Sequence, residues 1–366
     1  MIEVADILRQ HGAAYAAGHA LLPSQQRALR DIQCCRTAYF GGHVTQCDHC
    51  GLLRYTYHSC RNRHCPKCHG EQTDAWLERQ QTHLLPSPHY LLTFTLPADL
   101  RSLAFGHQKR VYGALLRCAA AALLKLTQDP RWLGATPTVL AVLHTWTRAM
   151  LYHPHVHLLV SAGGLSTDGQ RWLTPKDPAF LVPVRALSVI FRAKLREALM
   201  QLGLLARTPT AVWRKPWVVH AQHAGSGAKV LDYLARYVFR VAITNSRIES
   251  FERGQVTFRY RDNRTQQLRR VCLPVADFIG RFLQHVLPRG FPKVRHYGLA
   301  STARAQDRER ARALFPAPTP TSAPTPPPEA LADPAPAILA PPQCPRCHQG
   351  HLLVIQTLRP RRKFPP

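Results

Sequence analysis

Hydrophobic and polar positions along the chain change between helical and strand spacing. Ile2, Ile7 and Leu8 recur at helical spacing, and a second helix is predicted to begin near Ser24. The segment that begins at His89, HYLLTFTLP, is rich in β-forming residues and ends at a proline, as strands often do. The same spacing predicts further helices over 71–85, 101–127, 183–204 and 227–243, and another in DFIGRFLQHVLP.

Strand-like segments dominate the middle of the chain. TPTVLAVLHTW and HVHLLVSAGG are predicted to form two strands joined by a short turn, and KPWVVHAQ is a further strand. The segment FERGQVTFRYRDNRTQQLRRVCLP is typical of a hairpin that turns at Asp262 and Asn263. Strands and helices in this order predict an α+β fold, in which an antiparallel sheet is flanked by helices and preceded by a cysteine-rich zinc-binding module.

Composition divides the chain into four segments. Residues 1–85 combine predicted helices with a stretch dense in Cys, His and Arg, and residues 86–300 carry the predicted sheet. Residues 301–342 begin with charged positions and end in a stretch where 316–342 holds eleven prolines, which is typical of a disordered linker. Residues 343–366 form a short tail that again contains Cys and His.

Charge narrows the range of functions. Lys and Arg number 48 against 21 Asp and Glu, which gives a formal net charge of +27. Such a charge is typical of proteins that neutralise the phosphates of a nucleic acid. No run of 18 apolar residues is present, and the N-terminus lacks the basic and apolar regions of a signal peptide. We therefore expect a DNA-binding protein that is cytoplasmic, associated with the nucleoid, and has no membrane partner.

Cysteine spacing predicts a metal site in the first segment. Of the eleven cysteines, seven lie between Cys34 and Cys68, and the chain has no secretory signal, so metal ligation is favoured over disulfides. Cys47 and Cys50 form one Cys-x2-Cys pair, and Cys65 and Cys68 form another after 14 intervening residues. Two such pairs at this spacing match a structural zinc site with four thiolate ligands.

Other Cys and His residues leave further metal sites open. A second, interleaved zinc site would use Cys35, His43, Cys60 and His64. In the tail, Cys344 and Cys347 make half of a site that His348 or His351 would complete, or the tail is a degenerate end. Basic residues surround the N-terminal ligands and are candidates for DNA contacts, notably Arg61 and Arg63.

Three histidines are candidates for a catalytic metal centre. His155 and His157 are two positions apart in a strand, so both imidazoles point to the same face of the sheet. His144 lies on the predicted partner strand, and a turn near 149–152 would place it opposite one of them. A chain with 20 histidines could contain such a pair by chance, but the third aligned imidazole favours a metal site.

Two tyrosines are candidates for the nucleophile. Tyr233 and Tyr237 are four positions apart in the predicted helix 227–243, so they lie on one helix face, roughly 6 Å apart along the axis. In isolation, core packing would be the favoured explanation of both tyrosines. Beside a metal site and a strongly basic surface, they suggest two strand-cutting events in which tyrosine attacks a DNA phosphodiester. Arg236 and Arg240 on the same helix are candidates for phosphate contacts.

The motifs HPHVH and YLARY carry a resemblance to a known family. HPHVH resembles the HUH motif, and YLARY resembles a two-tyrosine nucleophile motif. Together with GGHVTQCDHCG and SCRNRHCPKC at the front and FIGRFLQHVLPRGFPKVRHYG near residue 298, they make the chain similar to rolling-circle insertion-sequence transposases of the IS91 type.

The resemblance implies a fold, a substrate and a cofactor. It implies an HUH endonuclease-like domain that acts on single-stranded DNA with Mg or Mn at the histidines, and His144 is carried over as the third ligand from related relaxases. It also implies cleavage and rejoining through a 5′-phosphotyrosine. The alternatives are another HUH enzyme, such as a plasmid replication initiator or relaxase, and a catalytically inactive zinc-dependent DNA-binding remnant.

Overall fold

The chain folds into two units. One unit comprises Met1–Gln33 with Asn62–Phe315, and is called the sheet unit here; the other comprises Cys34–Arg61 with Pro316–Pro366, and is called the cysteine unit. The computed structural model describes residues 1–68, 70–81, 83–226, 230–231, 242–262, 265–316 and 341–361.

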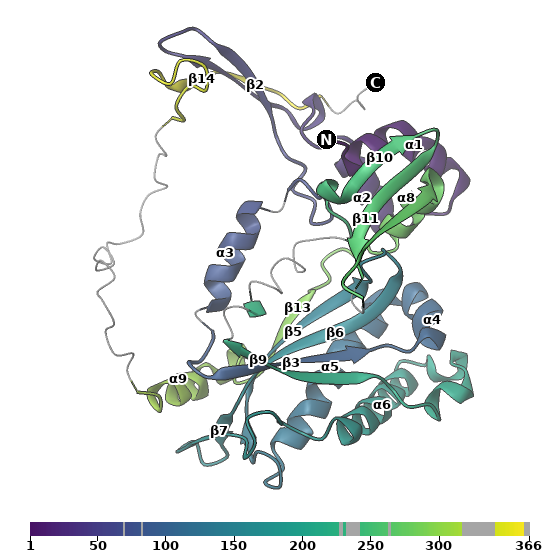
Figure 1. Cartoon of the computed structure of the whole chain (residues 1–366), viewed down its shortest axis with the longest axis vertical. Coiled ribbons are helices and arrows are strands. Elements are labelled where there is room, and N and C mark those ends of the chain that lie inside the picture. The colour runs from purple at the N-terminus through teal and green to yellow at the C-terminus, as the bar shows by residue number, and fades with distance from the viewer. Residues whose placement is uncertain are drawn as a thin grey trace. The chain divides into compact units, whose positions relative to one another are not determined.

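A five-stranded antiparallel sheet forms the centre of the sheet unit (Figure 1). The expected hairpin pairs β5 with β6, and the chain then places β3 beside β6 and β9 beside β3. The fifth strand, β13, pairs with the other edge of β5. The strands, in their order across the sheet, are β13 (Val294–Gly298), β5 (Thr138–Trp146), β6 (Tyr152–Ser161), β3 (Pro88–Thr95) and β9 (Val219–Ser226).

The sheet is buried on both faces because its central strands alternate between two apolar clusters. Val139, Ala141 and Leu143 of β5 belong to the larger core, whereas Leu140 and Val142 belong to a smaller cluster that also includes Trp76. Side chains of successive strand residues point to opposite faces, so this division assigns each residue to a face. The side chains of the even-numbered residues of β5 therefore lie on the face that carries the smaller cluster.

Helices cover the face of the larger core. In Figure 1, α5 (Gln108–Thr127) and α6 (Val184–Gln201) lie together on one side of the sheet, with α4 (Arg101–Gly106) at their end. The single helix expected over 101–127 is wrong, because the chain leaves helical geometry at His107, where φ is −128° and ψ is 40°. On the opposite face of the sheet, Trp76 of α3 (Gly70–Gln81) packs in the smaller apolar cluster.

The N-terminal helices pack within the sheet unit, against a second, smaller sheet region. Gln25 Nε2 donates to the Leu283 carbonyl at 3.0 Å, and the Val4 amide donates to Asn245 Oδ1 at 3.1 Å. The expected hairpin is present as β11 and β12, and a third strand, β10, extends it. The elements of this region are α1 (Val4–Gly18), α2 (Pro23–Gln33), β10 (Ile248–Glu252), β11 (Gln255–Arg261), β12 (Leu268–Pro274) and α8 (Val275–Leu283).

The cysteine unit contains a three-stranded antiparallel sheet with the order β14-β1-β2. β1 (Gly42–Cys47) and β2 (Leu53–Tyr57) form a hairpin, and β14 (Leu352–Leu358) from the C-terminal tail pairs with the other edge of β1. The tail is therefore part of this sheet. The Pro-rich stretch at 317–340, expected to be a disordered linker, lies outside the described residues.

Smaller elements complete the sheet unit, and the mixed α+β class with antiparallel sheets is confirmed. No helix in the described part of the chain is both long and apolar enough to span a membrane. These elements are β4 (Ala135–Thr136), β7 (Gly164–Ser166), β8 (Trp172–Leu173) and α9 (Ala305–Ala313), with short 3-10 helices at Ala98–Leu100, Leu205–Arg207, Thr210–Trp213, Asn245–Arg247 and Thr302–Arg304. The cysteine unit has a short 3-10 helix at Ala38–Phe40.

Candidate metal centre

Three histidines meet on the sheet face that carries the smaller apolar cluster. In the β5–β6 hairpin, His144 lies directly opposite His155, and His157 lies opposite Val142. The ring centroid of His144 is 4.5 Å from that of His157 and 5.2 Å from that of His155, and the last two rings are 4.9 Å apart. One nitrogen of each ring lies within 4.8 Å of the others. The three imidazoles predicted from the sequence are therefore brought together.

The turn between the two strands fixes this register. Met150 adopts a φ of 60°, and its amide donates to the Thr147 carbonyl at 3.0 Å. The Thr147 amide in turn donates to the Leu151 carbonyl at 3.0 Å, which closes the loop. A shift of one residue would move every imidazole on β6 to the opposite face. The turn thus determines that His144 and His155 share a face.

Hydrogen bonds orient two of the rings. His155 Nδ1 lies 2.7 Å from the His153 carbonyl oxygen. A carbonyl can only accept, so Nδ1 carries the proton and Nε2 is left as the unprotonated nitrogen. His157 Nδ1 lies 3.0 Å from Thr93 Oγ1, and a proton on Nδ1 donated to this hydroxyl leaves Nε2 in the same state. The carbonyl partner fixes the tautomer of His155, and the Thr93 hydroxyl orients the ring of His157.

Burial keeps the three rings neutral. It lowers the pKa of His155 to about 4 and that of His157 to about 3, with smaller effects from neighbouring histidines. Burial also lowers the pKa of His144 well below its usual value, and the charges of His157, His155 and Lys293 act in the same direction. At neutral pH all three side chains therefore present lone pairs, the form that binds a divalent cation.

The Thr93 hydroxyl offers a direct test of this orientation. We expect Thr93→Val to weaken Mn²⁺ binding by about 10-fold to 100-fold, because the partner of His157 Nδ1 is lost while the volume of the side chain is kept. Isothermal titration of the folded variant with Mn²⁺ measures the change. Thr95→Val, on the same strand and face, is the control and should bind as tightly as the unmodified protein. Equal affinity in both variants would refute the role given to Thr93.

Lys293 and Trp146 are neighbours of the histidines that the sequence did not single out. Lys293 Nζ lies 4.5 Å from the centre of the Trp146 ring, and the rings of Trp146 and His144 are stacked with centroids 5.4 Å apart. Burial, with a contribution from Arg63, lowers the pKa of Lys293 to about 7. No sequence motif marks either residue. The pairing of β13 with β5 brings them together.

The two candidate nucleophiles, Tyr233 and Tyr237, lie outside the described residues, as do Arg236 and Arg240. The chain just before them is described: Val230 and Leu231 are buried in the smaller apolar cluster with Leu91, Leu140 and Leu159. These strand residues lie on the same face as the three histidines. The segment that leads to the tyrosines therefore packs on the histidine face of the sheet.

The two N-terminal arginines proposed to contact DNA differ in their surroundings. Arg61 is exposed and has a φ of 50°. Arg63 donates from Nη1 to the Phe291 carbonyl at 2.7 Å and from Nη2 to the Pro288 carbonyl at 3.1 Å. The guanidinium of Arg63 thus anchors the loop before β13, whereas that of Arg61 remains a candidate for DNA contact.

Four cysteines of the cysteine unit form a group, but not in the combination expected from the sequence. The sulfurs of Cys47 and Cys50 meet those of Cys344 and Cys347, all within 4.8 Å of one another. Cys65 and Cys68, the expected partners of Cys47 and Cys50, are not in this group, and neither are Cys35 and Cys60.

The geometry of the β1–β2 hairpin explains this correction. Cys47 and Cys50 lie at its turn, whereas Cys35 and Cys60 flank its open end. At about 3.3 Å per residue, the six residues of β1 separate the two ends by more than one ion can bridge. The expected ligands His43 and His64 have other partners: His64 Nε2 accepts from the Leu287 amide at 3.1 Å, and the ring of His43 lies 5.7 Å from that of His58.

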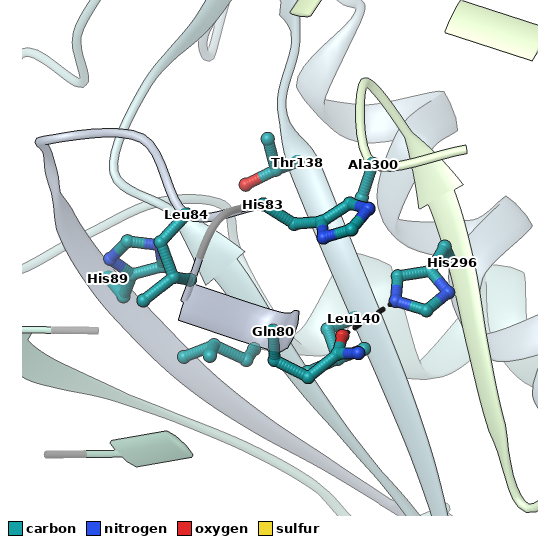
Figure 2. A pocket seen from close by; sticks show the side chains of 9 residues that line it. Gln80, His83, Leu84, His89, Thr138, Leu140, His296 and Ala300 are labelled. Carbon is teal, nitrogen blue, oxygen red and sulfur yellow. Dashed lines mark hydrogen bonds between the residues drawn. The ribbon is translucent and has the colours of Figure 1, made fainter. Parts of the chain in front are cut away.

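A second collection of histidines lines a small pocket farther along the sheet, near the start of β3 (Figure 2). His296 Nε2 is hydrogen-bonded to Gln80 Oε1 at 2.8 Å, and the ring of His83 lies 5.7 Å from that of His296. His89 is 1% exposed, and its burial lowers its pKa to about 4. The space of about 20 Å³ holds no more than a water molecule. We interpret this pocket as polar packing beneath α3.

Comparisons with known proteins agree with this arrangement. A model described as a transposase zinc-binding domain matches residues 7–96, and one described as a putative transposase matches residues 138–308. The chain is 40% identical over 380 residues to the putative transposase y4qJ of Sinorhizobium fredii, covering 97% of this chain and 95% of the relative. It is 30% identical over 298 residues to the transposase for insertion sequence element IS801 of Pseudomonas savastanoi pv. phaseolicola, covering 75% and 72% respectively. No solved structure matches the chain.

Proposed function

Because the chain belongs to the IS91 family of transposases, we propose that it cuts and rejoins single-stranded DNA through a 5′-phosphotyrosine, using a divalent metal held by His144, His155 and His157. The observation that carries the proposal is the convergence of three neutral imidazoles on one sheet face. Its other support is the buried segment at Leu231, two residues before Tyr233.

The residues of the chain have distinct parts in this reaction. His144, His155 and His157 would hold a Mg²⁺ or Mn²⁺ ion, which would polarise the scissile phosphate and stabilise charge on its oxygens. The phenolate of Tyr233 or Tyr237 attacks phosphorus, and the departing 3′ oxygen takes up a proton. The tyrosine ester conserves the bond energy, so the released 3′ hydroxyl, or that of another strand, can reverse the step. The second tyrosine provides a second cleavage.

The chain's charge suits this substrate. The net charge of +27 favours a polyanion. Arg61, Arg236 and Arg240 are proposed as further phosphate contacts. Relaxases and replication initiators would use the same chemistry, but the transposase relatives along nearly the whole chain favour the reaction of an insertion sequence.

A covalent adduct is the direct test. Purified protein, single-stranded DNA carrying an end of the element, and Mn²⁺ should give a protein–DNA species that survives SDS electrophoresis and disappears on protease treatment. Chelation of Mn²⁺ before mixing should prevent it. Stable binding of the DNA with no adduct over a range of Mn²⁺ and Mg²⁺ concentrations would instead support the inactive DNA-binding remnant.

A further inference from the structure

The C-terminal tail contributes both a strand and two thiols to the cysteine unit. β14 pairs with β1 from Gly42, opposite Leu358, to Cys47, opposite Leu352, with one irregularity between Val44 and Thr45. Cys347 Sγ lies 3.7 Å from Cys47 Sγ, although the two residues are 300 positions apart. The sulfurs of Cys50 and Cys344 are also 3.7 Å apart. The tail is thus joined to the hairpin along a strand edge and at its cysteines.

The two Cys-x2-Cys turns have the same backbone geometry. The residue that follows the second cysteine has a positive φ in each, 71° at Gly51 and 53° at His348. The amide of that residue donates to the carbonyl of the first cysteine, at 3.1 Å to Cys47 and at 3.0 Å to Cys344. Two loops of one shape, facing each other through their sulfurs, form the two halves of one site.

Backbone amides point at the sulfurs. The amides of His49 and Cys50 lie 3.4 Å from Cys47 Sγ, and the amide of Gly350 lies 3.5 Å from Cys347 Sγ. Hydrogen bonds from N–H groups favour the thiolate over the thiol. These amides are therefore arranged for sulfurs that carry negative charge, the form in which cysteine binds a metal.

The distance between the sulfurs distinguishes a metal from a disulfide. A disulfide requires about 2.05 Å between sulfurs. Four thiolates at about 2.3 Å from a tetrahedral zinc ion are about 3.8 Å from one another, which agrees with the 3.7 Å found for both pairs. The small apolar cluster here contains Leu352 and Leu52 besides the cysteines, which is too little to stabilise the fold without a metal.

We propose that Cys47, Cys50, Cys344 and Cys347 bind one structural zinc ion, so that the zinc-binding module of this chain is completed by its C-terminal tail. Protein fills all four positions, which leaves none for a substrate. Neither His348 nor His351 is needed as a zinc ligand, because both imidazoles lie outside the group of four sulfurs. The His351 amide instead donates to Asp48 Oδ1 at 2.8 Å.

Zinc content tests the proposal without reference to DNA cleavage. Inductively coupled plasma mass spectrometry of the full chain should show that C344S/C347S lowers bound zinc by one equivalent, and that C47S/C50S does the same. The quadruple variant should lose the same single equivalent, because the four residues serve one ion. Cys272→Ser removes an exposed cysteine that is not one of these four residues, so this variant should keep all the zinc. Unchanged zinc in C344S/C347S, or losses that add up in the quadruple variant, would overturn the proposal.

Cysteine alkylation of the unmodified protein gives a second readout that does not depend on the folding of a variant. Iodoacetamide labelling, followed by peptide mass spectrometry, should find Cys344 and Cys347 protected until a chelator is added, and then modified together with Cys47 and Cys50. Cys272 should react throughout. Tail cysteines that react as fast as Cys272 before chelation would contradict the site.

Gly350 offers a change that leaves every ligand in place. A Cβ at this position would lie 2.7 Å from Cys47 Sγ and 2.4 Å from Asp48 Oδ1, so the two turns could not approach as closely. We expect Gly350→Ala to lose zinc to a competing chelator at least 10-fold faster than the unmodified protein. Gly51→Asn is the control and should change this rate little, because asparagine tolerates the positive φ of this position. An unaltered rate in Gly350→Ala would argue against contact between the turns.

Discussion

Replacing both Tyr233 and Tyr237 by phenylalanine will abolish the covalent protein–DNA adduct. Phenylalanine keeps the aromatic ring but has no oxygen to attack phosphorus. Water could replace the tyrosine only in a slow hydrolysis that leaves no covalent product. Denaturing gels of labelled single-stranded DNA, incubated with Mn²⁺, measure both adduct and free cleaved product.

The single variants separate the two roles. If one tyrosine cuts first and the other completes the transfer, one variant should lose the first adduct and the other should retain it but fail to join the strands. Tyr260→Phe, on β11 of the smaller sheet, is the matched control and should cleave normally. Adduct formation by the double variant would show that another residue is the nucleophile.

His155→Ala and His157→Ala will each reduce Mn²⁺-dependent cleavage by about 1,000-fold or more. A bound cation contributes several kcal/mol to a phosphoryl transition state, and each 1.36 kcal/mol corresponds to a tenfold change in rate. Removing one of three imidazoles leaves a pair that binds the ion weakly and positions it poorly. Single-turnover rates measured across Mn²⁺ concentrations distinguish weaker binding from slower chemistry.

His153→Gln is the control for these variants. His153 lies on the same strand, its ring accepts from Arg101 at 2.7 Å, and it is outside the metal group. Its carbonyl, which orients His155, belongs to the backbone and is retained. A loss in His153→Gln as large as that in His155→Ala would mean that the strand, and not the metal site, is being disturbed. Full activity in His157→Ala would remove this residue from the site.

The histidine site was predictable because its information is local. Two imidazoles at i and i+2 must share a face of a strand, and a hairpin with a short turn brings the preceding strand alongside. On this basis His144 was predicted to lie opposite His155 or His157, and in the structure it lies opposite His155. Lys293 could not be found in this way, because the pairing of β13 with β5 joins segments about 150 residues apart.

The cysteine groups were not predictable from spacing. Cys47, Cys50, Cys65 and Cys68 have the spacing of a single zinc site, but spacing cannot show which thiols the fold brings together. The thiols that replace Cys65 and Cys68 come from the other side of a Pro-rich stretch, where the tail looked like half a site. The helix break at His107 was missed for a related reason: the apolar stripe of 101–127 continues through it.

The position of β14 imposes an order on synthesis. The strand that pairs with the outer edge of β1 is made roughly 300 positions after β1 itself. At about 5–20 residues per second, that edge stays open for about 15–60 seconds. An unpaired strand edge can form hydrogen bonds with the strands of other chains. A product whose synthesis stops before β14 would therefore have a first hairpin with an unpaired edge, even if its five-stranded sheet were complete.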